Sequence, residues 1–140
     1  MVTFEVPGDP HGKGRPKFAR RGNFVQTYTD KKTASYEDLV RFHANIAMVD
    51  LAPIEGAVAV YIYIKLAVPK SYSKKRTEAC LSGLERPTKK PDWDNVAKSI
   101  CDAMNGIVYQ DDTQIVDAYV TKVYAANSGV DVGVKFKGNK

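Results

Sequence analysis

Hydrophobic residues alternate with polar ones in four segments of the chain, which is the pattern of β-strands with one buried face. The strongest alternation covers Ala57–Val68, where apolar and mostly β-branched residues occupy every second position. Weaker alternation predicts further strands at Val2–Pro7, Gln114–Ala125 and 129–136. Because only a short Ala-Asn-Ser-Gly turn joins the last two segments, we expect them to form a hairpin.

A helical period of about 3.6 residues marks two other segments. Thr33–Val49 carries an apolar face that we expect to be buried: Tyr36, Leu39, Val40, His43, Ile46 and Ala47. Asn95–Asn105 turns a similar face inward: Val96, Ile100 and Ala103 or Met104. Gly106 suits the positive φ that often follows a helix. A shorter helix is expected at about Ser73–Leu81.

The order of these elements is strand, helix, strand, short helix, helix, strand, strand. It predicts an α+β fold, with a mixed β-sheet of about four strands packed with two main helices. Gly, Pro and basic residues dominate Gly8–Gly22, so we expect a loop or irregular arm there. A chain of 140 residues can bury a core of its own, and we assign residues 1–140 to one domain.

The composition is that of a globular protein, with 44% hydrophobic and 26% charged residues. Two cysteines, Cys80 and Cys101, are too few for a disulfide framework, which favours a reducing, cytoplasmic location. The longest apolar run, Ala57–Ile64, is too short for a membrane span, and the N-terminus lacks the pattern of a signal peptide. We therefore expect no membrane partner.

Charge is distributed unevenly along a chain whose formal net charge is +5. Residues 1–32 carry seven bases and three acids, and residues 65–90 carry eight bases and two acids. Residues 91–117 reverse this balance, with six acids and one base. Basic segments on either side of an acidic one indicate that a polyanion is bound and that acidic groups act on it.

The acidic segment contains two aspartate pairs, Asp92 with Asp94 and Asp111 with Asp112. The helix between the pairs would be about 16 Å long. If 107–111 is extended, it also spans about 16 Å and returns the second pair to the first. Carboxylates brought together in this way repel one another, and Mg²⁺, with Mn²⁺ as a possible substitute, would remove the conflict. The pattern predicts metal-assisted hydrolysis of a phosphodiester.

Asp94, Lys98 and Asp102 are spaced by four residues and share one helix face. Lys98 could neutralise the charge that develops during hydrolysis. Structural roles are the alternatives. Asp94 could cap the helix, Lys98 could pair with Asp94 or Asp102, and the Asp111–Asp112 pair could form a polar turn.

Residues Lys90–Ile115 resemble the signature of the RusA-type Holliday-junction resolvases. That signature reads Lys-Pro-Asp-x-Asp-Asn-hydrophobic-x-Lys, then Asp-Ala-hydrophobic-Asn, then Asp-Asp-x-Gln-hydrophobic, and every fixed position is filled here. The N-terminal sequence GDPHGKGRPKF is similar to a second box of the family, with Lys17 in place of the usual Arg. Trp93 departs from the family, which usually has a smaller aliphatic residue there.

The resemblance implies a Mg²⁺-dependent endonuclease that acts as a homodimer on four-way junction DNA, making paired symmetric cuts in recombination and repair, often in phages and prophages. By motif position, the resemblance assigns the essential carboxylates to Asp92, Asp94 and Asp112, with Asp111 beside them. It assigns the essential lysine to Lys98. Two identical sites in a two-fold dimer would suit two symmetric cuts.

The basic segments are expected to hold the DNA backbone through its phosphates. The candidates are Lys13, Arg15, Lys17, Arg20, Lys89 and Lys90. A solvated loop that keeps the protein soluble is the alternative. Two other functions also remain open: a non-catalytic nucleic-acid-binding protein, such as a phage regulator, and a nuclease of other branched DNA.

Overall fold

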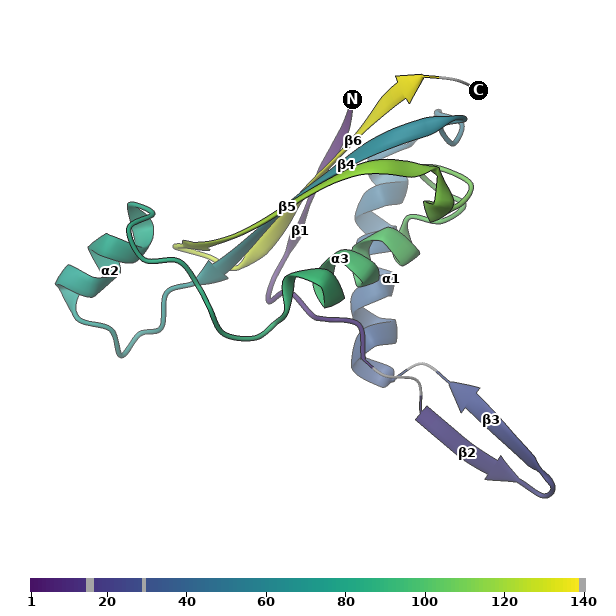
Figure 1. The fold of residues 1–140 in the computed structure, drawn as a ribbon, viewed down its shortest axis with the longest axis horizontal. Helices are drawn as coiled ribbons and strands as arrows, with labels where there is room; N and C mark the ends of the chain where they lie inside the picture. Colours follow the sequence, from purple (N-terminus) through teal and green to yellow (C-terminus); the bar gives the residue numbers. More distant parts are fainter. Residues whose placement is uncertain (15–16, 29, 139–140) are drawn as a thin grey trace.

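The computed structural model describes residues 1–14, 17–28 and 30–138. A four-stranded sheet carries helices α1 and α3 on one face (Figure 1). Its strand order is β1-β6-β4-β5, with β1 at Val2–Pro7, β4 at Ala57–Ala67, β5 at Ile115–Ala125 and β6 at Gly129–Gly138. The predicted α+β class with a mixed sheet is confirmed, and the four predicted strands agree with these bounds to within two residues.

The parallel pairing of β4 with β5 determines how the chain crosses the sheet. Parallel neighbours need a crossover connection, and here it contains α2 (Lys74–Leu81), α3 (Trp93–Ala103) and the 3₁₀ helix η1 (Asp112–Gln114). The other neighbouring strands of the sheet are antiparallel. All six aspartates of the acidic segment therefore lie in this crossover or at the start of the strand that follows it.

The predicted hairpin between the last two strands is wrong, because β4 lies between β5 and β6. The connection 126–128 passes across the end of β4 instead of making a tight turn. There the backbone N–H of Ala67 donates to Ser128 Oγ at 2.9 Å, and the N–H of Val68 donates to the carbonyl of Ala125 at 3.2 Å. These hydrogen bonds provide partners for the N–H groups at the end of β4, while the chain passes from β5 on one side of β4 to β6 on the other.

Helix α1 covers Lys31–Ala47 and begins two residues before the predicted Thr33. Asp30 caps it by accepting a hydrogen bond from the Thr33 N–H at 3.3 Å. The buried stripe runs through Thr33, Tyr36, Glu37, Val40, Ala44 and Met48. Ile46, which was predicted to be buried, is 58% exposed. The helix turns the row Tyr36, Val40, Ala44 and Met48 toward the sheet and α3, and Ile46 lies outside this row.

The expected irregular arm between Gly8 and Gly22 contains a regular strand, which corrects the prediction. Strands β2 (Lys17–Arg21) and β3 (Phe24–Tyr28) form an antiparallel hairpin that projects away from the four-stranded sheet (Figure 1). The Gly-Asn pair at its tip, with Gly22 at φ 61°, is a turn that matches the twist of two short strands. The hairpin's two strands of five residues each are too short for a clear hydrophobic alternation.

The core lies between the sheet and helices α1 and α3. Its largest fully buried side chains come from the sheet, from α1, from α3 and from the loop after α3: Val6, Val40, Val58, Val60, Ile64, Val96, Ile100, Met104, Val108, Tyr109, Val130 and Val134. Within the part of the chain described above, no helix has both the length and the apolar character needed to cross a membrane. The predicted inward face of α3 is confirmed.

Truncating Ile100 to alanine should lower the free energy of unfolding by about 2–5 kcal/mol, because the side chain is fully buried and leaves a cavity. Ile46→Ala is the matched control, and we expect a change within about 0.5 kcal/mol because that side chain is exposed. Urea unfolding of both variants measures the difference. Equal effects at the two positions would contradict the observed packing of α1.

Candidate active site

Helix α3 divides its residues between a buried and an exposed face. Val96, Ser99, Ile100 and Ala103 face the core. Asp92 is the residue that precedes the first helical turn, but its side chain does not cap the helix; its Oδ2 accepts from Asn95 Nδ2 at 3.5 Å. The Asp94 carboxylate accepts the Asn95 N–H at 3.0 Å. Both carboxylates are exposed at the positive end of the helix.

The loop after α3 turns back sharply instead of running extended. Gly106, at φ 77° as predicted, donates its N–H to the Tyr109 carbonyl at 2.7 Å. Tyr109 is fully buried, and its hydroxyl donates to the Cys101 carbonyl at 2.7 Å. The predicted extended return over 107–111 is therefore wrong. The compact turn brings Asp112 beside Asp102, near the C-terminal end of α3, and not beside the first aspartate pair.

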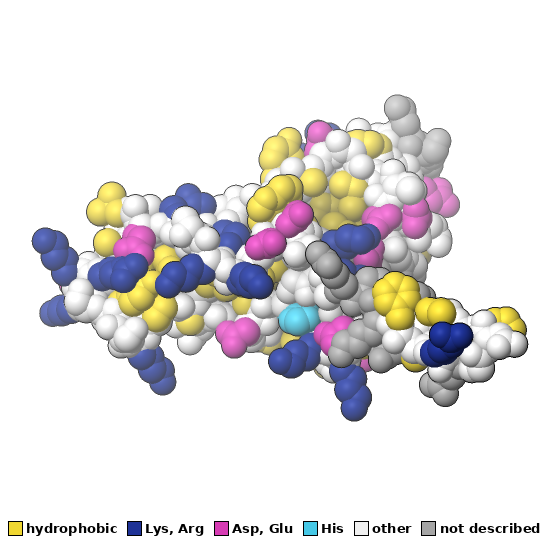
Figure 2. Space-filling model, turned by 60° about the horizontal axis from the view of Figure 1, so that its bottom comes forward, with side chains coloured by type: hydrophobic (Ala, Val, Ile, Leu, Met, Phe, Trp, Pro, Cys, Tyr) yellow, Lys and Arg dark blue, Asp and Glu magenta, His cyan; other side chains and the backbone are white. Residues whose placement is uncertain are grey.

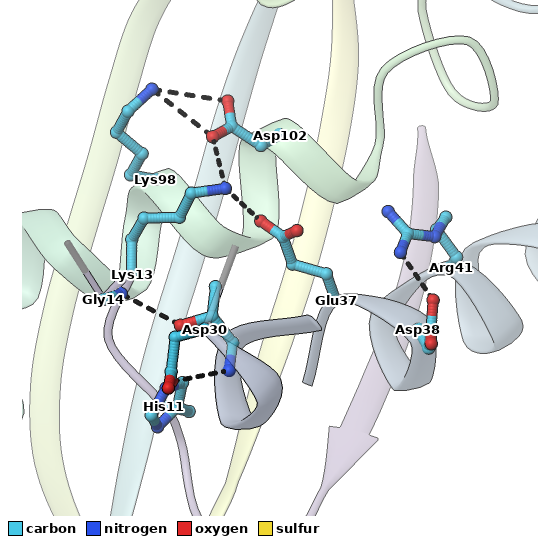
Figure 3. A network of polar contacts seen from close by, with 10 residues as sticks. His11, Lys13, Gly14, Asp30, Glu37, Asp38, Arg41, Lys98 and Asp102 are labelled. Carbon is cyan, nitrogen blue, oxygen red and sulfur yellow. Dashed lines mark hydrogen bonds and ion pairs between the residues drawn. The ribbon is translucent and has the colours of Figure 1, made fainter. Parts of the chain in front are cut away.

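A chain of ion pairs joins the N-terminal segment to both main helices (Figure 3). Lys13 Nζ lies 2.6 Å from Glu37 Oε2 on α1 and 3.3 Å from Asp102 Oδ2 on α3. Lys98 Nζ lies 3.3 Å from the same Asp102 oxygen. Burial opposes the charge on Lys13, but its hydrogen bonds to Glu37 and Asp102 prevail and raise the pKa of its ammonium. Asp102 is thus shared by two lysines.

The glycines of the N-terminal box allow Lys13 to reach this position. A Cβ at Gly12 would stand 2.9 Å from the Cβ of Asn95 on α3, and one at Gly14 would stand 3.0 Å from Thr33 Oγ1 on α1. The Lys13 N–H also donates to the Asn95 carbonyl at 2.9 Å. The segment therefore lies in close contact with both helices, and only glycine leaves room for its backbone.

Asp111 and Asp112 have opposite electrostatic surroundings. Partial burial, a hydrogen bond with Asp102 and the charges of Asp102 and Asp111 raise the pKa of Asp112, although Lys98 opposes this. Hydrogen bonds from Thr113 lower the pKa of Asp111, which begins the 3₁₀ helix. Asp112 therefore occupies a crowded acidic position, whereas the backbone and a hydroxyl stabilise the charge on Asp111.

Sequence reasoning assigned no role to Gln114, yet this side chain positions the second aspartate pair. Its Oε1 accepts the N–H groups of Gln110 and Asp111 at 2.9 and 3.1 Å. Its Nε2 donates to the carbonyls of Ile54 and Gly56 at 2.8 and 2.9 Å. The signal was present as a capping pattern, an Asp followed three residues later by Gln. Gln114 thus anchors the aspartate loop to the segment before β4.

The four predicted metal ligands do not converge on one point. Among the described residues, no group of three or more His, Cys, Asp or Glu side chains lies close enough to hold a metal ion. Asp92 and Asp94 lie at the first turn of α3, and Asp112 lies with Asp102, two turns further along. The compact turn at Met104–Tyr109 causes this separation, because it keeps the second pair near the end of the helix where the loop begins.

The donor chemistry nevertheless suits Mg²⁺. The four candidates are carboxylates, which are the oxygen ligands that Mg²⁺ prefers. Within the described residues, none of the four forms an ion pair with Lys or Arg: Asp92, Asp94, Asp111 and Asp112. The raised pKa of Asp112 indicates carboxylate crowding that a cation would relieve.

The predicted DNA-binding residues fall in three places. Lys13 and Lys90 line a groove with Pro10, His11, Asp92 and Asn95, so this groove joins basic side chains to the first aspartate pair. Lys89 and Arg20 are exposed. Arg15 and the side chain of Lys17 lie outside the described residues. Figure 2 shows basic side chains over the α2 end of this face and acidic side chains nearer its middle.

A thiol nucleophile has no support in this structure. Burial raises the pKa of Cys101 to about 11, which keeps the thiol protonated at neutral pH. Trp93, which departs from the family pattern, is 58% exposed at the first turn of α3. It therefore does not belong to the core, and its ring is available to a partner.

Asp112→Asn should raise the melting temperature slightly at neutral pH without divalent metal. An acid whose pKa is raised by folding stabilises the folded state below its unfolded pKa, about 3.9, and this stabilisation is lost as pH rises through the folded pKa. The Asp112→Asn variant has no carboxyl group to ionise at this position, so its folded state does not lose stability in this way. Melting curves from acid to neutral pH should therefore coincide at the acid end and separate as pH rises. A variant less stable than wild type at neutral pH would contradict the crowding.

Gln114→Ala should lower the free energy of unfolding by about 1–3 kcal/mol, because two N–H groups and two carbonyls lose their partner. Hydrogen exchange should accelerate at the amides of Gln110 and Asp111. Gln110→Ala is the control, since its exposed side chain can be removed while its N–H still donates. Unchanged exchange in Gln114→Ala would disprove the anchoring role.

Comparison with known proteins places this arrangement in a family. Residues 7–135, nearly the whole chain, match the family described as Endodeoxyribonuclease RusA. The chain is also similar to the "Uncharacterized protein YqaN" of Bacillus subtilis (strain 168), with 35% identity over 136 residues, covering 96% of this chain and 95% of that protein. The matched region includes the N-terminal box, both aspartate pairs, Lys98 and Gln114. The chain therefore belongs to the RusA endodeoxyribonuclease family.

Proposed function

We propose that this protein is a Mg²⁺-dependent endodeoxyribonuclease that resolves Holliday junctions by paired symmetric cuts, in recombination and repair, as a homodimer in the cytoplasm. One observation carries the proposal: the exposed Asp92 carboxylate, at the start of α3, lines a groove together with Lys13 and Lys90. Family membership supports nuclease chemistry.

The chemistry is hydrolysis of a phosphodiester, in which water adds to phosphorus while a phosphorus–oxygen bond breaks. Asp92, Asp94, Asp111 and Asp112 would hold Mg²⁺, for which Mn²⁺ could substitute. When bound, the ion supplies positive charge that polarises the phosphoryl oxygens. The Lys98 side chain is 62% exposed and lies beside Asp102, so its ammonium can approach the phosphate and neutralise the charge that develops there.

The basic side chains would hold the substrate around this site. Lys89, Lys90 and Arg20 are exposed and suit phosphate contacts, which position DNA without reading its sequence. Lys13 differs from them, because its ammonium is held between Glu37 and Asp102. We therefore assign Lys13 a second task in addition to any contact with DNA: it keeps Asp102 and the N-terminal segment in place.

The dimer is supported by symmetry and by surface area. A four-way junction has two equivalent strands to cut, and a two-fold dimer supplies two equivalent sites. The chain exposes 8975 Å², whereas a monomeric protein of 15.5 kDa exposes about 7,200 Å². Excess surface of this size suits a chain that covers part of itself with a partner or a substrate.

A second candidate is a nucleic-acid-binding protein that does not cut. The observation in its favour is that the described carboxylates form no ready group of metal ligands. A nuclease that prefers other branched DNA is a variant of the main proposal. Both alternatives predict results that differ from those of a junction resolvase in one assay.

Wild type should linearise a supercoiled plasmid that extrudes a cruciform, since two paired cuts in one encounter give linear DNA. Asp92→Asn and Asp112→Asn should each reduce cleavage by more than about 100-fold while retaining DNA binding, because a metal ligand is lost. Replacing Mg²⁺ with EDTA should stop cleavage by wild type.

Asp117→Asn is the matched control, because Asp117 lies on β5 and pairs with Lys137, away from the loop. Binding of the cruciform without any cutting by wild type would support the non-catalytic alternative and disprove the enzyme. Nicked circles without linear product would argue against paired cuts. Faster cutting of flaps or forks than of four-way junctions would assign a different substrate.

A further inference from the structure

We propose that the β2–β3 hairpin presents Phe18 and Phe24 as stacking surfaces for bases left unstacked at the branch point of the DNA. The inference rests on the proposed function, since it concerns how a junction would be recognised. It goes beyond phosphate contacts, because aromatic rings recognise the flat faces of bases and not the charged backbone.

The hairpin exposes three large hydrophobic side chains, which a two-stranded sheet cannot bury by itself. Phe18, Phe24 and Val25 are 71%, 76% and 66% exposed. The cross-strand register pairs Phe18 with Thr27 and Phe24 with Arg21, so the two rings lie on opposite faces of the hairpin. Neither face of a two-stranded sheet can bury its own rings, and such hairpins are only marginally stable alone. A partner must therefore supply the missing contacts.

The charge around the rings identifies the class of that partner. Residues 10–29 contain five bases and no acid: Lys13, Arg15, Lys17, Arg20 and Arg21. An exposed aromatic pair within such a segment is complementary to a polyanion that also offers flat apolar faces. Nucleic acid has both properties. A protein surface of average composition would not neutralise the positive charge of this segment. Figure 2 shows hydrophobic and basic side chains together on the projecting arm.

The position of the hairpin favours the branch point over regular duplex. The chain enters the hairpin directly after Lys13 and Gly14, which are held against α3 and α1 beside the aspartates. Strands of five residues extend about 17 Å from that point. Bases inside a duplex are stacked on both sides, so a ring finds a free base face only where stacking is interrupted. At a four-way junction this occurs next to the site of cutting.

The test uses the full-length protein, EDTA to prevent cleavage, and a four-way junction with the fluorescent base aminopurine beside the branch. Wild type should change the aminopurine fluorescence, because a stacked ring alters the surroundings of the base, and it should bind the junction more tightly than a linear duplex of the same arms. The double variant Phe18→Leu/Phe24→Leu should lose at least about tenfold in junction affinity and lose the fluorescence change, with duplex affinity retained.

Two further variants separate stacking from simple hydrophobic contact. Phe18→Tyr/Phe24→Tyr keeps both rings and should retain junction affinity and the fluorescence change. Phe42→Leu removes a similarly exposed ring from α1 and should behave like wild type. If the double leucine variant binds the junction as tightly as wild type, or if light scattering shows that it changes the oligomeric state, the inference is overturned.

Failure of this inference is distinguishable from failure of the proposed function. A double leucine variant that cuts and binds junctions normally overturns the role of the hairpin and leaves the nuclease intact. Conversely, a wild type that never cuts but still changes the aminopurine fluorescence, in a manner that needs the rings, overturns the nuclease and supports the hairpin.

Discussion

The contact of Lys13 with Glu37 and Asp102 is the interaction on which the site depends. It joins three parts of the chain that are distant in sequence: the N-terminal segment, α1 and α3. Glu37 is almost fully buried, so an unpaired charge there would be costly. The same contact positions Asp102, which forms an ion pair with Lys98 and raises the pKa of Asp112. The carboxylates therefore cannot be arranged independently of the N-terminal box.

The sheet imposes a second constraint on the acidic segment. Because β4 and β5 are parallel neighbours, the chain must return from the end of β4 to the start of β5 through a crossover connection. The signature motif occupies the last part of that crossover. Gln114 closes the crossover by bonding to the backbone just before β4. The beginning of β5 is thus fixed beside the beginning of β4, and the aspartate loop lies at that edge of the sheet.

These constraints give the residues of the motif separate physical tasks. Gly12 and Gly14 allow close approach of the backbone to α3 and α1. Gln114 anchors the loop, and Asp111 begins the 3₁₀ helix. The residues whose side chains are left for chemistry are Asp92, Asp94 and Lys98, which are exposed, and Asp112, which is half-buried. Asp92 and Asp94 lie at the start of α3, whereas Asp112 begins η1 and lies beside Asp102. In the proposed nuclease, bound Mg²⁺ or DNA would have to draw these groups together.

Local patterns in the sequence determined the four strands of the main sheet, the helices, the buried face of α3, the positive φ of Gly106 and the pairing of Lys98 with Asp102, because neighbours in the chain create each of these features. The tertiary structure alone decided that β4 separates β5 from β6, that Ile46 faces solvent and that Asp112 lies beside Asp102. These features depend on contacts between distant segments, which the period of a single segment does not encode.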